Sequence, residues 1–212
     1  MIIWLASYPK SGNTWLRTII NQIIDNNLKN KDEIFEDLLN IRRYPTQSDI
    51  IGLSEISANN SIKDKKKKLI EHTIKNWITS QENLNLNNKV NIFKAHNMLC
   101  EINLDGKKYS FTNLKNTIGV IHIVRDPRNL ITSLKSHFSH DAEEDTINMI
   151  LNKFSWTGFT KDEAPQLLSS WNNHYNSWKK FPKNNLLIRY EDLLNNTKKE
   201  INKLSDYLSN FI

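Results

Sequence analysis

The chain has 212 residues, 38% hydrophobic and 25% charged, a balance typical of a folded globular protein rather than a disordered one. No apolar run approaches the ~18 residues that a membrane-spanning helix needs, and Met1–Ala6 lacks the basic flank of a signal peptide. The single cysteine, Cys100, excludes an internal disulfide and a cysteine-rich metal cluster, while the net charge of +6 favours an anionic partner.

The chain begins with a strand pattern followed directly by a helix pattern. The apolar run Ile2–Ser7 predicts a buried strand, and apolar residues at helical spacing over Leu16–Ile24 predict a helix. The stretch 40–61 has no clear period, and we expect irregular cover over the sheet. Ser61 and Asp64 form a capping-box pattern that predicts the start of a second helix.

Two further strands and two helices are predicted in the middle of the chain. The strands are Val90–Lys94 and Ile118–Val124, both rich in β-branched and apolar residues. Asp126 followed by Pro127 is typical of a helix start, because aspartate caps the first turn and proline fits its first position. A long helix is predicted over Pro165–Lys179.

The last strand is predicted over Leu186–Arg189, and a capping box of Thr197 with Glu200 predicts the last helix. None of the four strands alternates cleanly with polar residues, a pattern typical of strands that are buried on both faces. Strands separated by helices indicate an α/β fold, a three-layer α/β/α domain with a four- or five-stranded parallel sheet. We expect residues 1–212 to form a single domain.

The turn Tyr8–Trp15 joins the first strand to the first helix, where backbone N–H groups and the helix N-terminus bind phosphate in many proteins. Gly12 permits a tight turn, Lys10 adds a positive charge, and Ser11 and Thr14 add hydroxyl donors. The turn is P-loop-like, but it is not a Walker A loop, because the order is Lys-Ser-Gly and no glycine precedes the lysine. The alternative is an ordinary strand–helix turn with a solvated lysine.

Arg125 follows the third strand, at the sheet edge where ligands of open α/β folds bind. Ser133 lies about two helical turns after Asp126, on the same helix face, so a guanidinium and a hydroxyl are expected to converge on one anion. The alternative is an arginine–carboxylate pair beside a solvent-facing serine.

Two more residues follow predicted strands. His96 comes after the second strand, where an imidazole could act as a general base, although a lone histidine is more often structural. Tyr190 ends the last strand and could stack on a nucleotide base; the alternative is a rim aromatic that covers the end of the sheet.

In this order, the segments resemble the sulfotransferases that use 3′-phosphoadenosine 5′-phosphosulfate (PAPS), most closely the cytosolic and bacterial type. Tyr8–Trp15 is similar to that family's 5′-phosphosulfate loop, with Asn13 where threonine is usual. Arg125–Ser133 resembles its 3′-phosphate segment, and Lys94-Ala95-His96 resembles its Lys-Thr-His. The later helix and strand are also similar, at Trp171, His174, Trp178 and Tyr190–Leu193.

The resemblance implies a role for each of these residues. The 5′-phosphosulfate would be bound by Lys10, Ser11, Gly12, Asn13 and Thr14. The 3′-phosphate would be bound by Arg125 and Ser133, and the adenine would be contacted by Trp15 and Tyr190. His96 would be the general base, Lys10 would neutralise the leaving phosphate oxygen, and Lys94 would steady the transferring group. Lysines and backbone donors can supply this charge, and no metal is expected.

One feature departs from the family pattern. Family members continue past the last helix into a loop that closes over the 3′-phosphate, whereas this sequence stops at Ile212. We therefore expect the domain to be incomplete at its C-terminal end, which puts cofactor affinity and full turnover in question.

The sequence hypothesis is a sulfotransferase that moves the sulfuryl group of PAPS to a hydroxyl of a small molecule, lipid or saccharide. One alternative is a P-loop NTPase or kinase using Mg-ATP, supported by Ser11 after Lys10 and by Asp126. Another is a non-catalytic binder of adenosine 3′,5′-bisphosphate (PAP) or of polyanions. The acceptor walls are expected in the loops 40–61, 97–116 and 139–165. No pattern favours nucleic acid or a particular oligomer, and a cytoplasmic location is expected.

Overall fold

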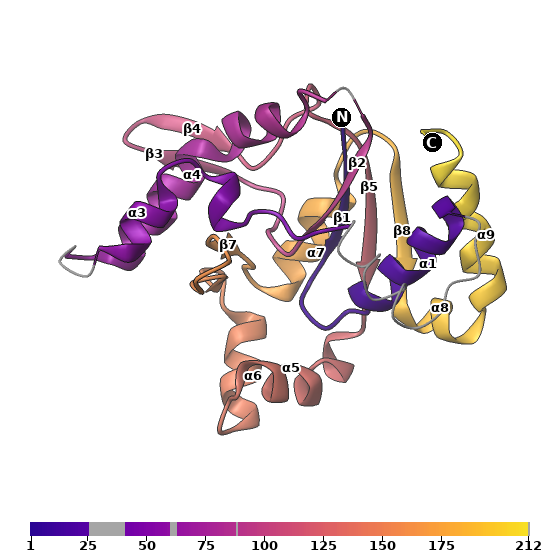
Figure 1. Ribbon diagram of the computed structural model, residues 1–212. Coiled ribbons are helices and arrows are strands. Elements are labelled where there is room, and N and C mark those ends of the chain that lie inside the picture. Colours follow the sequence, from indigo (N-terminus) through magenta and orange to yellow (C-terminus); the bar gives the residue numbers. More distant parts are fainter. Residues whose placement is uncertain (26–40, 60–62, 88, 212) are drawn as a thin grey trace.

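A computed structural model describes residues 1–25, 41–59, 63–87 and 89–211. Its centre is a four-stranded, wholly parallel sheet in the order β2-β1-β5-β8, so the prediction of a parallel α/β sheet is confirmed (Figure 1). The strands are β1 (Ile2–Ser7), β2 (Asn91–Ala95), β5 (Thr117–Val124) and β8 (Asn185–Arg189). Every residue of β1 is buried, because neighbouring strands flank it and helices cover both of its faces.

Helices on both faces make the three layers that the sequence predicted (Figure 1). One face is covered by α1 (Asn13–Asp25), α8 (Tyr190–Asn195) and α9 (Thr197–Leu208). The other is covered by α4 (Lys65–Leu84) and α7 (Trp171–Lys179). The side chains of β1 alternate between them: Ile3 packs with the first group, and Trp4 packs with the second.

Smaller elements surround this core. Those between α1 and β5 are the 3-10 helix η1 (Gln47–Asp49), α3 (Leu53–Ala58), and the antiparallel hairpin of β3 (Glu101–Leu104) with β4 (Lys107–Ser110). Those after β5 are the 3-10 helix η2 (Pro127–Asn129), α5 (Ile131–Phe138), α6 (Glu143–Leu151), and the short ribbon of β6 (Trp156–Thr157) with β7 (Gln166–Leu167). Helices α5 and α6 lie beyond the carboxyl ends of the sheet strands (Figure 1).

Two predictions of local structure in the first half of the chain need comment. The described part of the stretch 40–61 is not purely irregular, because it contains η1 and α3 and joins β2 through a bridge between Arg43 and Lys94. Residues 40, 60 and 61 of that stretch lie outside the described residues, and they include Ser61 of the predicted capping box. Asp64 occupies the N-cap of α4 in a left-handed conformation.

Two predictions in the second half are wrong. The helix expected from Pro165 begins only at Trp171, where the Ser170 hydroxyl accepts a hydrogen bond from the Asn173 N–H, and the preceding residues are extended and include β7. The capping box at Thr197 does not form, because its hydroxyl donates to the Leu193 carbonyl oxygen at the end of the preceding helix. Pairing with β6 keeps residues 166–167 extended in the first case, and a bond to the end of α8 uses the Thr197 hydroxyl in the second.

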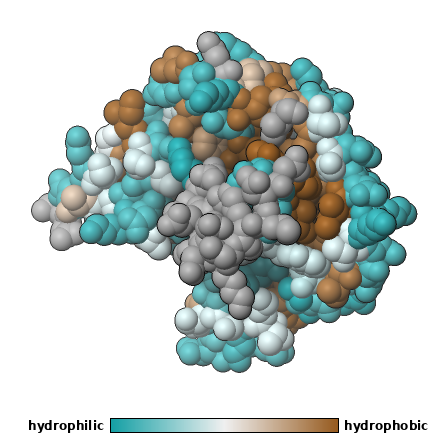
Figure 2. Space-filling model, turned by 45° about the vertical axis from the view of Figure 1, so that its right-hand side comes forward, coloured by the Kyte–Doolittle hydropathy of each residue, from teal (hydrophilic) through white to brown (hydrophobic). Residues whose placement is uncertain are grey.

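One face of the described chain has a polar rim. Figure 2 shows hydrophilic residues around the outer rim of one face and hydrophobic residues gathered in its upper and central part. Among the helices of the described residues, none is both long and apolar enough to cross a membrane. Because all four strands are parallel, their carboxyl ends, and the residues that follow them, lie at one edge of the sheet.

Candidate functional site

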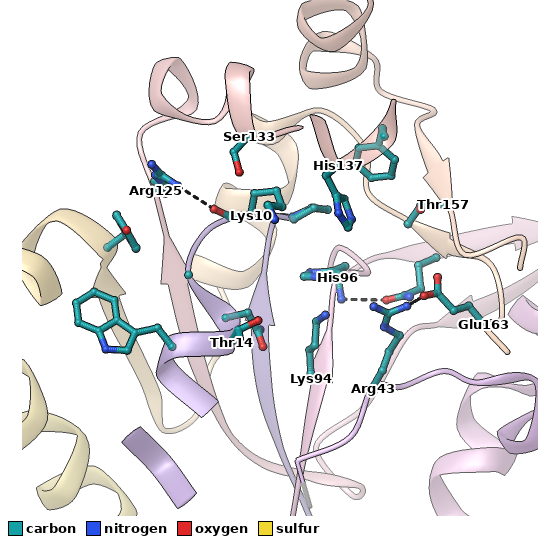
Figure 3. A pocket seen from close by; sticks show the side chains of 17 residues that line it. Lys10, Thr14, Arg43, Lys94, His96, Arg125, Ser133, His137, Thr157 and Glu163 are labelled. Atoms are coloured by element: carbon teal, nitrogen blue, oxygen red, sulfur yellow. Dashed lines mark hydrogen bonds and ion pairs between the residues drawn. The ribbon is translucent and has the colours of Figure 1, made fainter. Parts of the chain in front are cut away.

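A cavity of about 570 Å³ opens at the carboxyl edge of the sheet, and Figure 3 shows the side chains that line it. In the sheet, β1 lies between β2 and β5, so the chain leaves β1 toward one neighbour and later returns to the other side of β1. Ligands of open α/β sheets bind at such a point, where the order of the strands reverses. The lining includes these residues predicted from the sequence: Lys10, Gly12, Asn13, Thr14, Trp15, Lys94, His96, Arg125, Ser133 and Tyr190. It also includes Pro9, Arg43, His137, Phe138, Thr157, Glu163 and Gln166.

The turn between β1 and α1 is shaped by close packing against α8. Lys10 and Gly12 both have a left-handed backbone, with φ of 65° and 95°. A Cβ atom on Gly12 would lie 2.5 Å from Cδ2 of Tyr190, so only glycine fits this approach. The first residues of α1 line the cavity, and the positive end of the helix dipole therefore faces it.

The side chains of Ser11 and Asn13 point away from the cavity centre. The Asn13 amide donates to the Ser7 hydroxyl at 3.0 Å and to the Leu5 carbonyl oxygen at 3.4 Å, which ties α1 to β1. Ser11 is fully buried and is not part of the lining, and its Oγ has no hydrogen-bond partner among the described residues. From this turn, the backbone and Lys10 are thus better placed than these two side chains to meet a ligand.

Arg125, Tyr190 and Trp15 form a stacked cluster on one side of the cavity. The Arg125 guanidinium lies 4.4 Å above the Tyr190 ring and donates to the Lys10 carbonyl oxygen at 3.3 Å. The Tyr190 and Trp15 rings meet edge to face at 5.9 Å. Arg125 Nε is buried without a hydrogen-bond partner in the described chain, and Ser133 lines the same side from α5. This side therefore offers a cation, a hydroxyl and aromatic surfaces together.

His96 lies at the centre of the cavity and is fixed through its Nδ1 atom (Figure 3). Nδ1 is 2.7 Å from the Ser7 carbonyl oxygen, which can only accept, so the ring proton is on Nδ1 and Nε2 carries a lone pair. Gln166 accepts from the His96 backbone N–H at 2.9 Å, and buried His174 donates from Nε2 to the His96 carbonyl oxygen at 3.2 Å. Burial and the nearby Lys94 ammonium hold the pKa of His96 well below its usual value, so the imidazole is neutral.

The cavity has an excess of positive charge. Lys10, Arg43, Lys94 and Arg125 contribute cations, whereas Glu163 contributes the one carboxylate among the described residues of the lining. Burial, with the Arg43, Arg17 and Lys10 charges, lowers the pKa of Lys94 from 10.5 to about 7. Such crowding of cations is unfavourable unless an anion shares the site, so the electrostatics favour a ligand with several negative charges.

On the opposite side of the cavity, sequence reasoning proposed acceptor loops and Phe138, which could equally have been core, but it missed the polar residues. Arg43 and Glu163 form an ion pair there, and His137, Phe138 and Thr157 complete the wall. Arg43 comes from the expected acceptor loop 40–61, and Thr157 and Glu163 come from the expected loop 139–165. His137 and Phe138 belong instead to the end of α5, and the lining contains no residue from the third expected loop, 97–116. The Arg42-Arg43 pair was the one visible signal, and nothing in its sequence context indicates that Arg43 rather than Arg42 faces the cavity.

The two residues that supported the Mg-ATP alternative, Ser11 and Asp126, do not line this cavity, and Asp126 is paired elsewhere. Its carboxylate accepts from the Arg128 backbone N–H at 2.9 Å and from Arg128 Nε at 3.0 Å. Those bonds to Arg128 lower the pKa of Asp126 to about 2. Among the residues that the structure describes, no three His, Cys, Asp or Glu side chains are grouped so that they could hold a metal ion.

Comparison with known proteins gives one family and several similar folds. The family model described as "Sulfotransferase domain" matches residues 2–210. Retinol dehydratase, solved with androsterone and inactive cofactor PAP, has a TM-score of 0.57 and 18% sequence identity to this chain. A mouse sulfotransferase complexed with PAP has a TM-score of 0.54 and 20% identity.

Both alignments cover 98% of this chain, which spans 59% of the retinol dehydratase chain and 57% of the mouse chain. At these identities, the solved structures establish the fold. No curated protein matches the chain.

Proposed function

The chain belongs to the sulfotransferase domain family, and we propose that it transfers a sulfuryl group from PAPS to a hydroxyl group of an acceptor. The observation that carries this proposal is the meeting of the Lys10 turn, Arg125 and His96 around one cationic cavity. The Lys10 turn would bind one phosphate of the donor, Arg125 would bind the second, and His96 would remove the proton of the acceptor. The geometry brings them together from three different strand ends.

The residues on the Arg125 side fit the donor. Buried Arg125 Nε has no partner in the described chain, and an anion at this position would satisfy it. Gly12 has no side chain to cover the turn, and backbone N–H groups in such a turn before a helix are suited to contact a phosphate. We assign the 5′-phosphosulfate to Lys10, the turn and Thr14, the 3′-phosphate to Arg125 and Ser133, and the adenine to Trp15 and Tyr190.

When bound, PAPS would supply an activated sulfuryl group whose transfer places negative charge on the leaving phosphate oxygen. Lys10, in the turn between β1 and α1, lines the cavity and would neutralise that charge. Lys94 would balance the charge on the transferring group. Both side chains line the cavity from the ends of neighbouring strands, so their positive charge is close to the site where the negative charge would develop.

His96 would take the proton of the acceptor hydroxyl at Nε2. The bond from Nδ1–H to the Ser7 carbonyl oxygen fixes the ring and leaves Nε2 as an acceptor. The same bond stabilises the imidazolium that forms after proton transfer, because the carbonyl oxygen faces the Nδ1–H dipole. The lowered pKa of His96 means that the base is ready in its neutral form at physiological pH.

Thermal-shift titration with PAP, and separately with ATP and Mg²⁺, tests the donor site first. A ligand that binds the folded state raises Tm by mass action, and we expect a shift with PAP that exceeds the shift with Mg-ATP. A shift with Mg-ATP alone would favour the NTPase alternative. A shift with PAP but no transfer to any acceptor would favour a non-catalytic binder.

Two variants then test the roles of the residues. We expect Lys10→Ala to weaken PAP binding and transfer together, and His96→Ala to abolish transfer while PAP affinity stays nearly unchanged. His72→Ala is the matched control, because His72 is a histidine on α4 that contacts the Ile51 carbonyl oxygen outside the cavity. Transfer at the original rate in Lys10→Ala, or loss of PAP binding in His96→Ala, would contradict the assigned roles.

A further inference from the structure

The cavity has two sides, separated by His96 (Figure 3). Arg125, Ser133 and Trp15 lie on the side assigned above to the donor. The other side is formed by Arg43, His137, Phe138, Thr157, Glu163 and Gln166. If the donor occupies the first side, the second side is where an acceptor hydroxyl can approach Nε2 of His96. Its lining therefore determines which acceptors fit.

The second side is built mostly from hydrogen-bonding groups. Of its six described side chains, Phe138 is the one hydrocarbon. Arg43 and Glu163 form an ion pair, and their side chains are 31% and 26% exposed. Both partners therefore keep contact with the cavity, and atoms that the pair leaves unused are available to a ligand. Burial also lowers the pKa of Arg43 from its usual value, although a guanidinium remains charged at any physiological pH.

The backbone holds this ion pair in place from both sides. Arg43 is bridged to Lys94 of β2, and the flanking bonds from Lys94 N–H to the Arg42 carbonyl oxygen and from Tyr44 N–H to the Lys94 carbonyl oxygen are both 2.9 Å. On the other segment, Glu163 is bridged to Thr46. The pair is thus pre-organised on two chain segments that are joined to each other, which lowers the entropic cost of binding.

From this arrangement we propose that the Arg43–Glu163 pair selects acceptors rich in hydroxyl groups, of the saccharide or polyol class, over apolar alcohols. This proposal rests on the proposed function and assigns these two residues as specificity determinants. Adjacent hydroxyls can donate to the Glu163 carboxylate and accept from the Arg43 guanidinium, which replaces the bonds that water makes there. The Phe138 ring can pack against the C–H face of a sugar ring.

An apolar acceptor would be disfavoured for a complementary reason. It would remove water from a charged pair and offer no hydrogen bond in return, and such unpaired polar groups are costly. Sites built to hydrogen-bond a hydroxyl discriminate against analogues that lack it by up to about 10⁴–10⁵. Because the pair here is partly exposed, we expect a smaller preference in kcat/KM, on the order of 10².

The test measures acceptor binding and transfer separately, with PAP affinity as the internal reference. A panel of mono- and disaccharides is compared with 1-octanol and 2-naphthol, by ligand-observed NMR in the presence of PAP and by transfer assays with PAPS. The key variant carries Arg43→Met and Glu163→Met, which replaces the ion pair by apolar side chains of similar volume. Glu163→Gln is the conservative variant, for the case in which the double variant does not fold.

The matched control carries Lys115→Met and Glu82→Met. It removes an ion pair of 3.0 Å on the outer surface, and neither residue lines the cavity. We expect the Arg43/Glu163 variant to lose saccharide binding and transfer by about 10²-fold and to gain activity with 1-octanol, with PAP affinity unchanged. Glu163→Gln should lose about 10-fold of the saccharide kcat/KM. The control should behave like the wild type.

The outcomes distinguish the two proposals. Wild-type protein that binds PAP but prefers 1-octanol or 2-naphthol to every saccharide would overturn the selectivity while leaving the sulfotransferase function standing. Unchanged selectivity in folded Arg43/Glu163 and Glu163→Gln variants would overturn the role of the pair. Failure of the wild type to bind PAP would contradict the proposed function, and the acceptor assignment would fall with it.

Discussion

Substituting Gly12 by alanine should distort the turn between β1 and α1, because the added Cβ atom would collide with the Tyr190 ring. The new Cβ atom would lie 2.5 Å from Tyr190 Cδ2, 3.0 Å from Cε2 and 3.3 Å from Cδ1 of Ile123. Two of these contacts are with a ring that also packs on Arg125 and Trp15, so the ring cannot shift without disturbing the cluster. The residue would also have to keep a φ of 95°, which L-amino acids rarely adopt.

The magnitude follows from adding these two costs. A left-handed backbone costs about 1–2 kcal/mol for a non-glycine residue, and overpacking a filled site adds about 1–3 kcal/mol. Gly106 supplies the matched control, because it has a φ of 79° in the β3–β4 turn but its Cβ would meet nothing within 4 Å. Gly106→Ala should therefore pay the backbone cost alone. The two variants should differ by about 1–3 kcal/mol, which corresponds to roughly 2–12 °C in Tm for a chain of this size.

Calorimetry of both variants, followed by PAP titration, measures this difference. We expect Gly12→Ala to melt below Gly106→Ala and to lose PAP affinity, because a displaced Tyr190 would no longer support Arg125 or the proposed adenine site. Gly106→Ala should bind PAP like the wild type. Equal Tm values for the two variants would refute the reasoning, because the contact with Tyr190 would then add nothing to the loss of unfolding free energy.

Three further outcomes are expected. Burial lowers the pKa of Lys94 to about 7, so between about pH 7 and 10.5 the unfolded state holds a proton that the native state lacks. The contribution of Lys94 to the free energy of unfolding therefore rises with pH in that window. Lys94→Met should raise Tm most below pH 7, by about 2–4 °C for each kcal/mol of unfolding free energy gained, while transfer is lost. Because kcat/KM reports the free enzyme, a pH profile should fall above about pH 7 as Lys94 loses its charge, and Lys94→Arg should move that fall to higher pH; an identical profile in both proteins would contradict this role. Ser170→Ala should cost about 1 kcal/mol in an unfolding titration, because it removes the N-cap of α7, and no loss would mean that water replaces the cap.

Part of the cavity was predictable because several of its residues lie at or shortly after the ends of strands. The carboxyl end of a parallel strand fixes the position of the next residue, so Lys10, His96, Arg125 and Tyr190 could be placed at one edge from the order of the strands alone. The predicted strands agree with the structure to within one or two residues for the same reason, since a buried strand needs an uninterrupted apolar run.

The acceptor side could not be predicted in this way. Arg43 and Glu163 are 120 positions apart and meet because their segments bridge to each other and to β2, a pairing with no local signal. The orientation of Asn13 was equally hidden, because only the tertiary contact with Ser7 decides whether its amide faces the cavity or the sheet. The late start of α7 has a similar origin, since residues 166–167 pair with β6 before the helix can begin.

The position of β1 in the middle of the sheet has a consequence for synthesis. Ile2 pairs with Asn91 on one side and with Thr117 on the other, so this uncharged and fully buried strand leaves the ribosome long before either partner exists. At about 5–20 residues per second, the second partner strand follows some 6–23 s later. During that interval Ile2–Ser7 is a short apolar segment with strong β-propensity and no gatekeeping charge, the type that associates between chains. The strand that anchors the turn before α1 is thus also a segment of the nascent chain that is prone to association before its partner strands are made.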